Sequence, residues 1–521
     1  MVIERAGGCT RRTLRQLAAA RGVRAVATSV LVTATMSLAT AAARAGDDAP
    51  PPAADGAAKP AAPAEAPKAE AAKAPETPKA VPPAAPAPPA DDGRSALRSA
   101  VEGVVGTEVH GRFTLKWESR IVDGDHDETD HDLYGTLDLR VGDSARDEYS
   151  GSASVRGAWD LDQPNSRRSG SSFSSLADTY DSELSALLYT AWGQWRPKTG
   201  ALETVRVGRQ YIDVAESFHF DGAAVATKPL DEKLALRLKV YGGVPVHYYE
   251  APASGDWLAG VQASAEPWKD GRAAIDYAHV EDELSGYDDQ RNDLAAVSVW
   301  QRIGKDADLF GRFTWLDGPS DFRLRGTVSF PESDLLVQAS YKRLLDDKED
   351  YATEFDPYFR TLRTLREYHL GDVRAVKGFG ENFQVEVGAS ARELVHESDE
   401  GPFNRETARV WLMPSVDDLL WKGSTLTAGI ESWSGDGERI KTWSADLTHR
   451  FDKNTRASIG SDYSLYDYGE LRLGERSHVR SAYGRFSTKL SDHLNLDFRY
   501  AWERDEEDTY HVVSLAVSVD F

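Results

Sequence analysis

The chain has 521 residues, of which 41% are hydrophobic and 28% charged, and its formal net charge is −23. This composition allows a folded core, and the acidic balance argues against nucleic acid as a partner. The single cysteine, Cys9, lies in an N-terminal segment that we expect to be removed. Disulfides, iron–sulfur clusters, attached c-type haem and cysteine-bound zinc are therefore excluded, and no cofactor is expected.

Residues 1–45 have the pattern of an export signal. A basic region between Arg11 and Arg24 precedes an apolar stretch from Ala25 to Ala42, and the Ala-Arg-Ala that follows has the small-x-small form of a cleavage site. The apolar stretch is short and rich in threonine and serine, which disfavours a membrane-spanning helix. We therefore predict a signal peptide and a mature chain that begins near Gly46.

Residues 46–94 have a different composition. Of the 24 prolines, 13 fall between residues 46 and 92, among alanine, lysine and glutamate. Such a segment cannot bury enough apolar surface to fold, and it is typical of a semi-rigid, partly polyproline-II linker. We predict a disordered linker in the periplasm, either a spacer or stalk that contacts the cell wall or a solvated tail without a specific role.

Residues 95–521 consist of segments in which apolar and polar residues alternate, as in Val109–Trp117 and Leu494–Trp502. Alternation with a period of two indicates β-strands. We place 22 segments and take 18 as the lower bound, because the alternation is imperfect near residues 222, 367 and 407. The segments begin near residues 108, 132, 151, 186, 203, 222, 233, 256, 272, 293, 307, 321, 334, 367, 382, 407, 424, 441, 455, 479, 493 and 510.

The connections between these segments alternate in length. Odd connections, such as 161–183 and 345–366, are long, and even ones, such as 304–306 and 453–454, are short. This sorting is typical of bacterial transmembrane barrels, whereas a soluble sandwich has no reason to show it. Sheet edges cannot stay unpaired in lipid, so such a sheet must close. The sequence predicts an all-β fold: a closed antiparallel transmembrane β-barrel of about 18–22 strands, preceded by the disordered Pro/Ala-rich segment.

Tryptophans lie near the ends of the predicted strands, where an aromatic girdle at the membrane interface would place them. They are Trp117, Trp159, Trp195, Trp257, Trp315 and Trp502.

The last strand, His511 to Phe521, ends in phenylalanine and resembles the assembly signal of Gram-negative outer-membrane barrels. The resemblance implies insertion into the outer membrane by the barrel-assembly machinery, among lipid and lipopolysaccharide. Residues Val205–Gln210, followed by Phe220–Gly222, are similar to a strand–loop–strand signature of general porins and of alginate-export-type porins. Alginate-export barrels have 18 strands and the segmentation favours more, so the resemblance implies a porin without implying transport of alginate itself.

Cations predominate at the positions that the alternation directs into the lumen, although the region as a whole is acidic. A basic wall beneath acidic loops favours anions in a low-dielectric tube. The alternative is that the charges pair across strands and leave a weakly selective, water-filled channel. The proposed lumen-lining residues include Arg112, Arg140, Arg156, Arg206, Arg237, Arg312, Arg323, Arg325, Arg392 and Arg499.

Arg209 falls on the lipid-facing parity of its strand, where a charge is costly at the middle of the bilayer. A bulge or an early exit into the loop would turn it inward. In that case the segment Asp213–Phe220 would fold into the channel as a constriction, and Arg209, Asp213 and Asp221 are its candidate residues.

Asp123, Asp125 and Asp127 fall at the first ligand positions of an EF-hand-like loop, but the closing glycine and the distal glutamate are missing. We therefore predict a solvated acidic loop and no metal site, with these three residues as the candidate ligands should a cation bind.

The leading functional hypothesis is diffusion of small polar solutes, including anions, through the lumen, which needs no catalysis by the protein. The alternatives are a structural sheath for an electron-transfer cytochrome and export of an alginate-like polysaccharide. An outer-membrane enzyme is disfavoured because no Gly-x-Ser-x-Gly motif occurs in the barrel region.

Overall fold

The computed structural model describes residues 108–124, 128–161, 184–214, 216–248, 255–282, 290–316, 320–347, 366–400, 404–435, 438–468 and 476–521. The predicted signal peptide and linker lie outside the described residues. Among those described, no helix has the length and apolar character needed to cross a membrane. The helical content here is limited to the short 3-10 turns η2 (Pro331–Ser333) and η3 (Glu397–Asp399).

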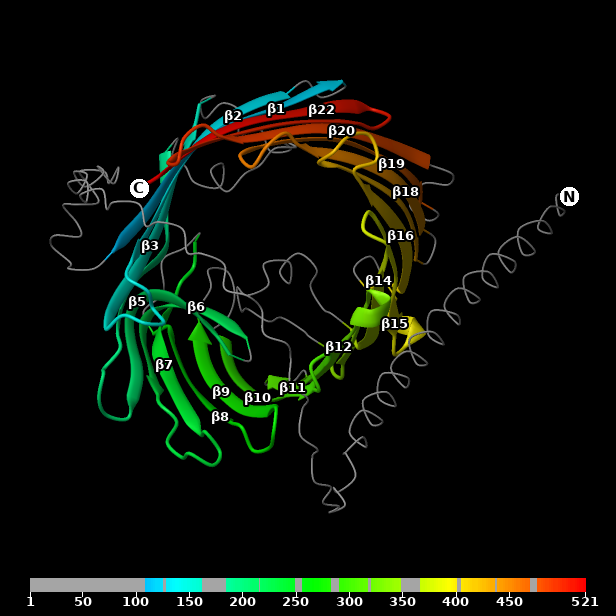
Figure 1. The fold of residues 1–521 in the computed structure, drawn as a ribbon. Coiled ribbons are helices and arrows are strands. Elements are labelled where there is room, and N and C mark those ends of the chain that lie inside the picture. Colours follow the sequence, from blue (N-terminus) through cyan, green and yellow to red (C-terminus); the bar gives the residue numbers. More distant parts are fainter. Residues whose placement is uncertain are drawn as a thin grey trace, which may run out of the picture.

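The described residues form one sheet of 22 strands in which each strand pairs antiparallel with the next and β22 pairs with β1 (Figure 1). The strands are β1 (Val109–Gly124), β2 (Glu128–Val141), β3 (Tyr149–Asp160), β4 (Leu184–Trp195), β5 (Leu202–Asp213), β6 (Ser217–Thr227), β7 (Arg237–Pro245), β8 (Trp257–Ala265), β9 (Gly271–Asp282), β10 (Gln290–Ile303), β11 (Ala307–Leu316), β12 (Ser320–Phe330), β13 (Leu335–Leu344), β14 (Tyr368–Phe379), β15 (Phe383–Leu394), β16 (Thr407–Asp417), β17 (Ser424–Gly435), β18 (Glu438–Arg450), β19 (Thr455–Tyr468), β20 (Arg476–Lys489), β21 (Leu494–Arg504) and β22 (Asp508–Asp520).

The predicted fold class is thus confirmed: the chain forms a closed antiparallel barrel with the strand number at the top of the predicted range. The largest difference in a strand start is at β6, which begins at Ser217 rather than near residue 222. Phe218 and Phe220 point inward there, while His219 and Asp221 point outward, so the parity of apolar and polar residues is reversed. Because polar residues stand at the outward positions here, the sequence pattern does not indicate a lipid-facing strand, and the start of β6 is missed.

Short connections gather at one end of the barrel, which we call the turn end, together with Val109 and Phe521. Examples are 304–306, 380–382 and 451–454, whereas β13 ends and β14 begins at the opposite end, which we call the loop end. In the turn 451–454, the N–H groups of Asn454 and Thr455 donate to Asp452 at 2.7 and 2.8 Å. These hydrogen bonds lower the pKa of the Asp452 carboxyl. One loop-end connection, 214–216, is also short.

The barrel closes along β1 and β22, with pairing from Arg112↔Asp520 to Gly124↔Asp508. Phe521 and Gly111 exchange two backbone hydrogen bonds of 2.8 and 2.9 Å. A Cβ on Gly111 would lie 2.2 Å from the Phe521 ring, so the ring rests directly against this glycine. The Arg112 guanidinium also donates to both carboxylate oxygens of Asp520, at 2.6 and 3.1 Å. The seam leaves no unpaired sheet edge along these residues, as a bilayer requires.

Large apolar side chains cover one face of the sheet and are exposed. Phe113, Ile275 and Ile459, on strands far apart in the ring, are 41%, 60% and 63% exposed. An apolar surface of this extent is stable only in contact with lipid or another apolar surface. Four of the predicted girdle tryptophans lie on the same outward face with exposed rings: Trp159, Trp195, Trp257 and Trp315.

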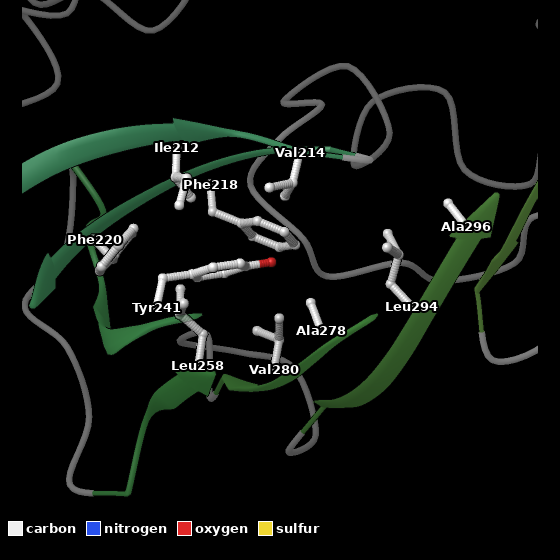
Figure 2. Packing of buried hydrophobic residues seen from close by; sticks show 10 residues of the cluster. All are labelled: Ile212, Val214, Phe218, Phe220, Tyr241, Leu258, Ala278, Val280, Leu294 and Ala296. Atoms are coloured by element: carbon white, nitrogen blue, oxygen red, sulfur yellow. The ribbon is translucent and has the colours of Figure 1, made fainter. Parts of the chain in front are cut away.

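Between β5 and β10 the wall forms a tightly curved corner, where inward side chains from different strands touch (Figures 1 and 2). Phe220 is fully buried, and the Tyr241 ring lies 5.9 Å from Phe218 and 6.1 Å from Phe220. Each large apolar side chain buried in this way contributes about 1.5–3 kcal/mol. We call the set the inner apolar cluster; it consists of Ile212, Val214, Phe218, Phe220, Tyr241, Leu258, Ala278, Val280, Leu294 and Ala296.

A row of glycines permits this curvature. Gly208, Gly222 and Gly243 are register partners across β5, β6 and β7. A Cβ on Gly222 would lie 2.1 Å from the backbone oxygen of Gly242, and Gly208 has a φ of 122°, which side chains rarely allow. The missing side chains let adjacent backbones approach closely on the inside of the bend.

Replacing Gly222 with alanine should destabilise the barrel by about 1–3 kcal/mol, because the added methyl group overlaps the backbone of β7. The measurement is the urea midpoint of the refolded barrel in lipid. Gly193→Ala on β4 is the matched control, since a Cβ there meets nothing within 4 Å. Equal midpoints for the two variants would show that the glycine row does not determine the bend.

Candidate functional site

The inner face of the barrel is the candidate site. The register places all ten proposed lumen residues on the face opposite the exposed apolar side chains. Arg112, for example, pairs with Asp138, while the neighbouring Phe113 pairs with Leu137. Arg206 pairs with Gln194, and Arg499 with Arg485, on the same inner face. The remaining residues at inward positions are Arg140, Arg156, Arg237, Arg312, Arg323, Arg325 and Arg392.

The register also places inward several charged residues that the sequence pattern missed, and most of them are acids. Asp132 and Asp321 lie at the predicted starts of their strands, and Asp508 lies just before the predicted start of the last strand; the register places all three on the inner face. The inner face is therefore closer to electrical balance than the sequence predicts. The additional residues include Arg120, Arg272, Arg374, Asp130, Asp132, Asp282, Asp308, Asp321, Asp372, Asp417 and Asp508.

Many inner charges pair with each other. Arg120 contacts Asp130 and lies 2.7 Å from Asp132, near the loop end. Arg323 donates to both oxygens of Asp321 at 3.0 Å. Further ion pairs join Arg374 to Glu386 at 2.6 Å and Arg409 to Glu431 at 2.7 Å. Pairing of this kind neutralises part of the wall and reduces its selectivity.

Other inner cations lie over aromatic rings instead. The Arg156 guanidinium is 4.3 Å from the Tyr134 ring, and that of Arg392 is 4.4 Å from the Tyr368 ring. Arg485 lies 4.8 Å from the Tyr483 ring. A ring face orients a guanidinium without cancelling its charge. These arginines therefore keep a positive field in the lumen.

The structure places Arg209 outward and does not turn it into the channel. The register of β5 with β6 runs unshifted from Thr204↔Ala226 to Asp213↔Ser217, so no bulge reverses Arg209. The Arg209 guanidinium donates to both oxygens of Asp221, at 2.8 and 2.6 Å, and to the Leu188 carbonyl at 3.0 Å. Asp213 ends β5 and accepts a hydrogen bond from Ser217 at 2.9 Å. The described residues of Asp213–Phe220 form paired strand ends rather than a loop folded into the channel, and Val214, Phe218 and Phe220 point inward as part of the inner apolar cluster.

The candidate metal ligands are only partly described. Asp123 lies at the end of β1, with a carboxylate oxygen 3.6 Å from His511 Nε2, while Asp125 and Asp127 lie outside the described residues. One group of described residues has the composition and spacing to hold a metal ion: ligand atoms of His247, Asp256 and Asp282 lie within 4.8 Å of one another. His247 Nε2 and Asp282 Oδ1 are 2.9 Å apart, a contact that joins the β7–β8 connection to the end of β9.

Comparison with protein-family models gave no match, and no curated protein matches the sequence. Several similar solved structures are outer-membrane porins. OccAB4 of Acinetobacter baumannii has a TM-score of 0.40 at 11% identity and covers 80% of this chain and 98% of its own. A BenF-like porin of Pseudomonas fluorescens Pf-5 has a TM-score of 0.40 at 10% identity, with coverage of 79% and 99%. The P pilus usher (PapC) translocation pore has a TM-score of 0.46 at 11% identity, with coverage of 79% and 99%.

Similarity at these TM-scores and identities carries no functional argument. No family match supports the resemblance to alginate-export-type porins, and the 22 strands differ from the 18 of that family.

Replacing Asp221 with asparagine should destabilise the barrel by about 2 kcal/mol, because Arg209 then faces the membrane without its carboxylate. The double variant Arg209→Leu/Asp221→Leu should recover at least the original stability, since it removes both charges from the outer face. The urea midpoint of unfolding in lipid vesicles measures the stability of both variants. An unchanged midpoint for Asp221→Asn would contradict this role of Asp221 and would mean that water solvates the Arg209 guanidinium in place of the carboxylate.

Proposed function

We propose that the chain is an outer-membrane porin, through which small polar solutes diffuse passively, with a preference for anions. The main support is one observation: a hydrogen-bonded ring of 22 strands is apolar on its outer face and lined with arginine, lysine and carboxylates on its inner face. An inner face of this composition is hydrated, and a hydrated tube across a membrane conducts solutes. Passage of this kind requires no chemistry from the protein, so no enzymatic activity is proposed.

The anion preference rests on the distribution of charge within the lumen. Among the described residues, Arg325, Arg485 and Arg499 have no carboxylate within 4.0 Å. The paired acids Asp130, Asp132 and Asp321 instead lie near the loop end. Near the loop end of the solute path these acids are thus compensated by Arg120 and Arg323, whereas the uncompensated arginines further in attract anions.

The purified protein in planar bilayers should give an ohmic current, and its reversal potential in a KCl gradient should favour chloride over potassium. Absence of ion flux would contradict the porin proposal and favour the sheath hypothesis, in which a cytochrome fills the lumen. A reversal potential that favours potassium would contradict the anion preference while leaving the porin proposal intact. No observation in the described residues favours the cytochrome sheath or polysaccharide export.

We also propose the topology that the sequence implies: a signal peptide at residues 1–45, a periplasmic linker at 46–94, and the turn end facing the periplasm. The C-terminal strand would be the signal that the barrel-assembly machinery recognises. The contact of Phe521 with Gly111 supports this, because recognition of the terminal strand and final closure of the barrel would then involve the same residue.

Lipopolysaccharide is the proposed lipid partner of the outer face. Near the loop end, Arg480 and Arg504 are register partners on the outward side, and Lys441 is exposed on the same side of β18. Beside Lys441 lies an apolar groove of about 380 Å³, lined by residues that include Ile430 and Trp443. Cations above an apolar groove match a lipid phosphate and its acyl chain.

After purification, the triple variant Lys441→Gln/Arg480→Gln/Arg504→Gln should carry about one tenth of the lipopolysaccharide bound to the original protein, or less. The reason is that each cation near an anionic surface contributes about 1 kcal/mol to lipid binding. Mass spectrometry of the lipid bound per barrel provides the measurement. Lys269→Gln/Lys305→Gln/Lys453→Gln, which removes three exposed cations at the turn end, should retain the full amount. Equal losses in the two variants would contradict a specific lipid site.

A further inference from the structure

A partly enclosed cavity lies on the inner face of the barrel, next to the inner apolar cluster. A cavity of about 410 Å³ is lined by residues of β4 to β9 and by Ser144 and Ala145 of the turn 142–148. On β5, Arg206 of the cavity lies nearer the turn end than Ile212 of the cluster, and on β7 Lys239 lies nearer than Tyr241. The cluster, shown in Figure 2, therefore lies between the cavity and the loop end.

The cavity has five cationic side chains, and we call it the basic pocket. Arg196 lies 3.7 Å from Glu203, which also lines the cavity, and the other four cations are Arg206, Arg237, Lys239 and Arg272. The Arg206 guanidinium donates twice to Gln194 Oε1, at 2.9 and 3.2 Å, and lies 4.2 Å from the Trp192 ring. The Arg272 guanidinium lies 5.2 Å from the Trp300 ring. Neutral amide and ring contacts thus orient both guanidinium groups while leaving their charges uncompensated.

Four of the five cations, Arg206, Arg237, Lys239 and Arg272, form no ion pair with the described residues, in contrast with many charges elsewhere in the lumen. Within the described ranges, none of them has a carboxylate oxygen within 4.0 Å. Two acids lie close by, but Glu203 is 3.7 Å from Arg196, and Asp276 accepts a 2.6 Å hydrogen bond from Gln262. Like charges around a partly enclosed space repel one another more strongly than they would in bulk water. An anion in the cavity would relieve this repulsion.

We propose that the basic pocket binds a small anion with two or more carboxylate or phosphate groups. The proposal rests on the proposed porin function and deepens it, because it names the class of solute that pauses in the channel. Guanidinium groups bind the paired oxygens of carboxylates and phosphates through parallel hydrogen bonds, and the ammonium of Lys239 adds a compact charge between them. A volume of about 410 Å³ admits a metabolite-sized anion and excludes a folded polymer.

The test uses citrate and inorganic phosphate as separate probes on the full-length protein. In planar bilayers in KCl, each probe that binds should reduce the current with a saturable concentration dependence, and isothermal titration in detergent should give a matching affinity. Lys239→Gln/Arg272→Gln should weaken both effects at least about ten-fold, since each lost charge contact to a bound anion is expected to be worth a factor of this order. Arg237→Gln, at an exposed position, serves as a milder variant should the double variant fold poorly.

The matched control is Arg456→Gln/Lys489→Gln, which removes one arginine and one lysine from inward positions at the turn end, outside the corner formed by β5 to β10. It should leave the probe affinity within about two-fold. An equal loss in the two double variants would assign the effect to the general lumen charge and overturn the pocket. Response to citrate alone would assign the pocket to carboxylates, and response to phosphate alone to phosphates.

Failure of the pocket and failure of the porin proposal are distinguishable. If ions flow but neither probe has a saturable effect, the basic pocket is wrong and the porin proposal stands. If no ions flow but titration shows citrate or phosphate binding that Lys239→Gln/Arg272→Gln abolishes, the pocket stands and passive diffusion is wrong.

Discussion

The structure depends on one constraint: in hydrocarbon, every backbone N–H and C=O must find a partner within the protein. A sheet meets this requirement only when its last strand pairs with its first. Here β22 lies against β1, and the terminal Phe521 exchanges backbone hydrogen bonds with Gly111. Closure fixes one face of every strand toward lipid and the other toward the lumen. The alternating sequence, the sorted connections and the charged interior all follow from that division.

The corner from β5 to β10 is an exception to this division, because it has apolar residues on its inner face and charged residues on its outer face. Toward the loop end its inner face is apolar, because the tight bend brings Phe218, Phe220 and Tyr241 into contact with one another and removes them from water. Its outer face carries Arg209 and Asp221 as an ion pair, and the His219 ring stacks on Tyr211 at 4.0 Å. The width of a barrel grows with its strand number, so 22 strands enclose a wide lumen. The inner apolar cluster fills part of that lumen with side chains of the wall itself.

The same corner separates two electrostatic environments. Elsewhere in the lumen, acids at neighbouring positions compensate cations such as Arg323 and Arg409. Beneath the cluster, Arg206, Lys239 and Arg272 line a cavity and have no carboxylate oxygen of the described residues within 4.0 Å, because Glu203 in the same lining contacts Arg196 instead. Because the apolar cluster displaces water on one side, the charges there interact through a lower dielectric than those along the open wall. The bend thus concentrates positive charge that an evenly curved wall would distribute around the lumen.

The amino-acid sequence by itself determined the fold class, a range of 18–22 strands and the inward parity of residues such as Arg112 and Arg499, because a period of two and the spacing of turns are local properties. It did not determine the start of β6, where a tertiary bend reverses which parity is apolar. Nor did it reveal the partner of Arg209, the inward acids near the loop end or the grouping of Arg206, Lys239 and Arg272. Those features depend on strand register and on wall curvature, and both are set by contacts between residues on different strands rather than by the pattern along any one of them.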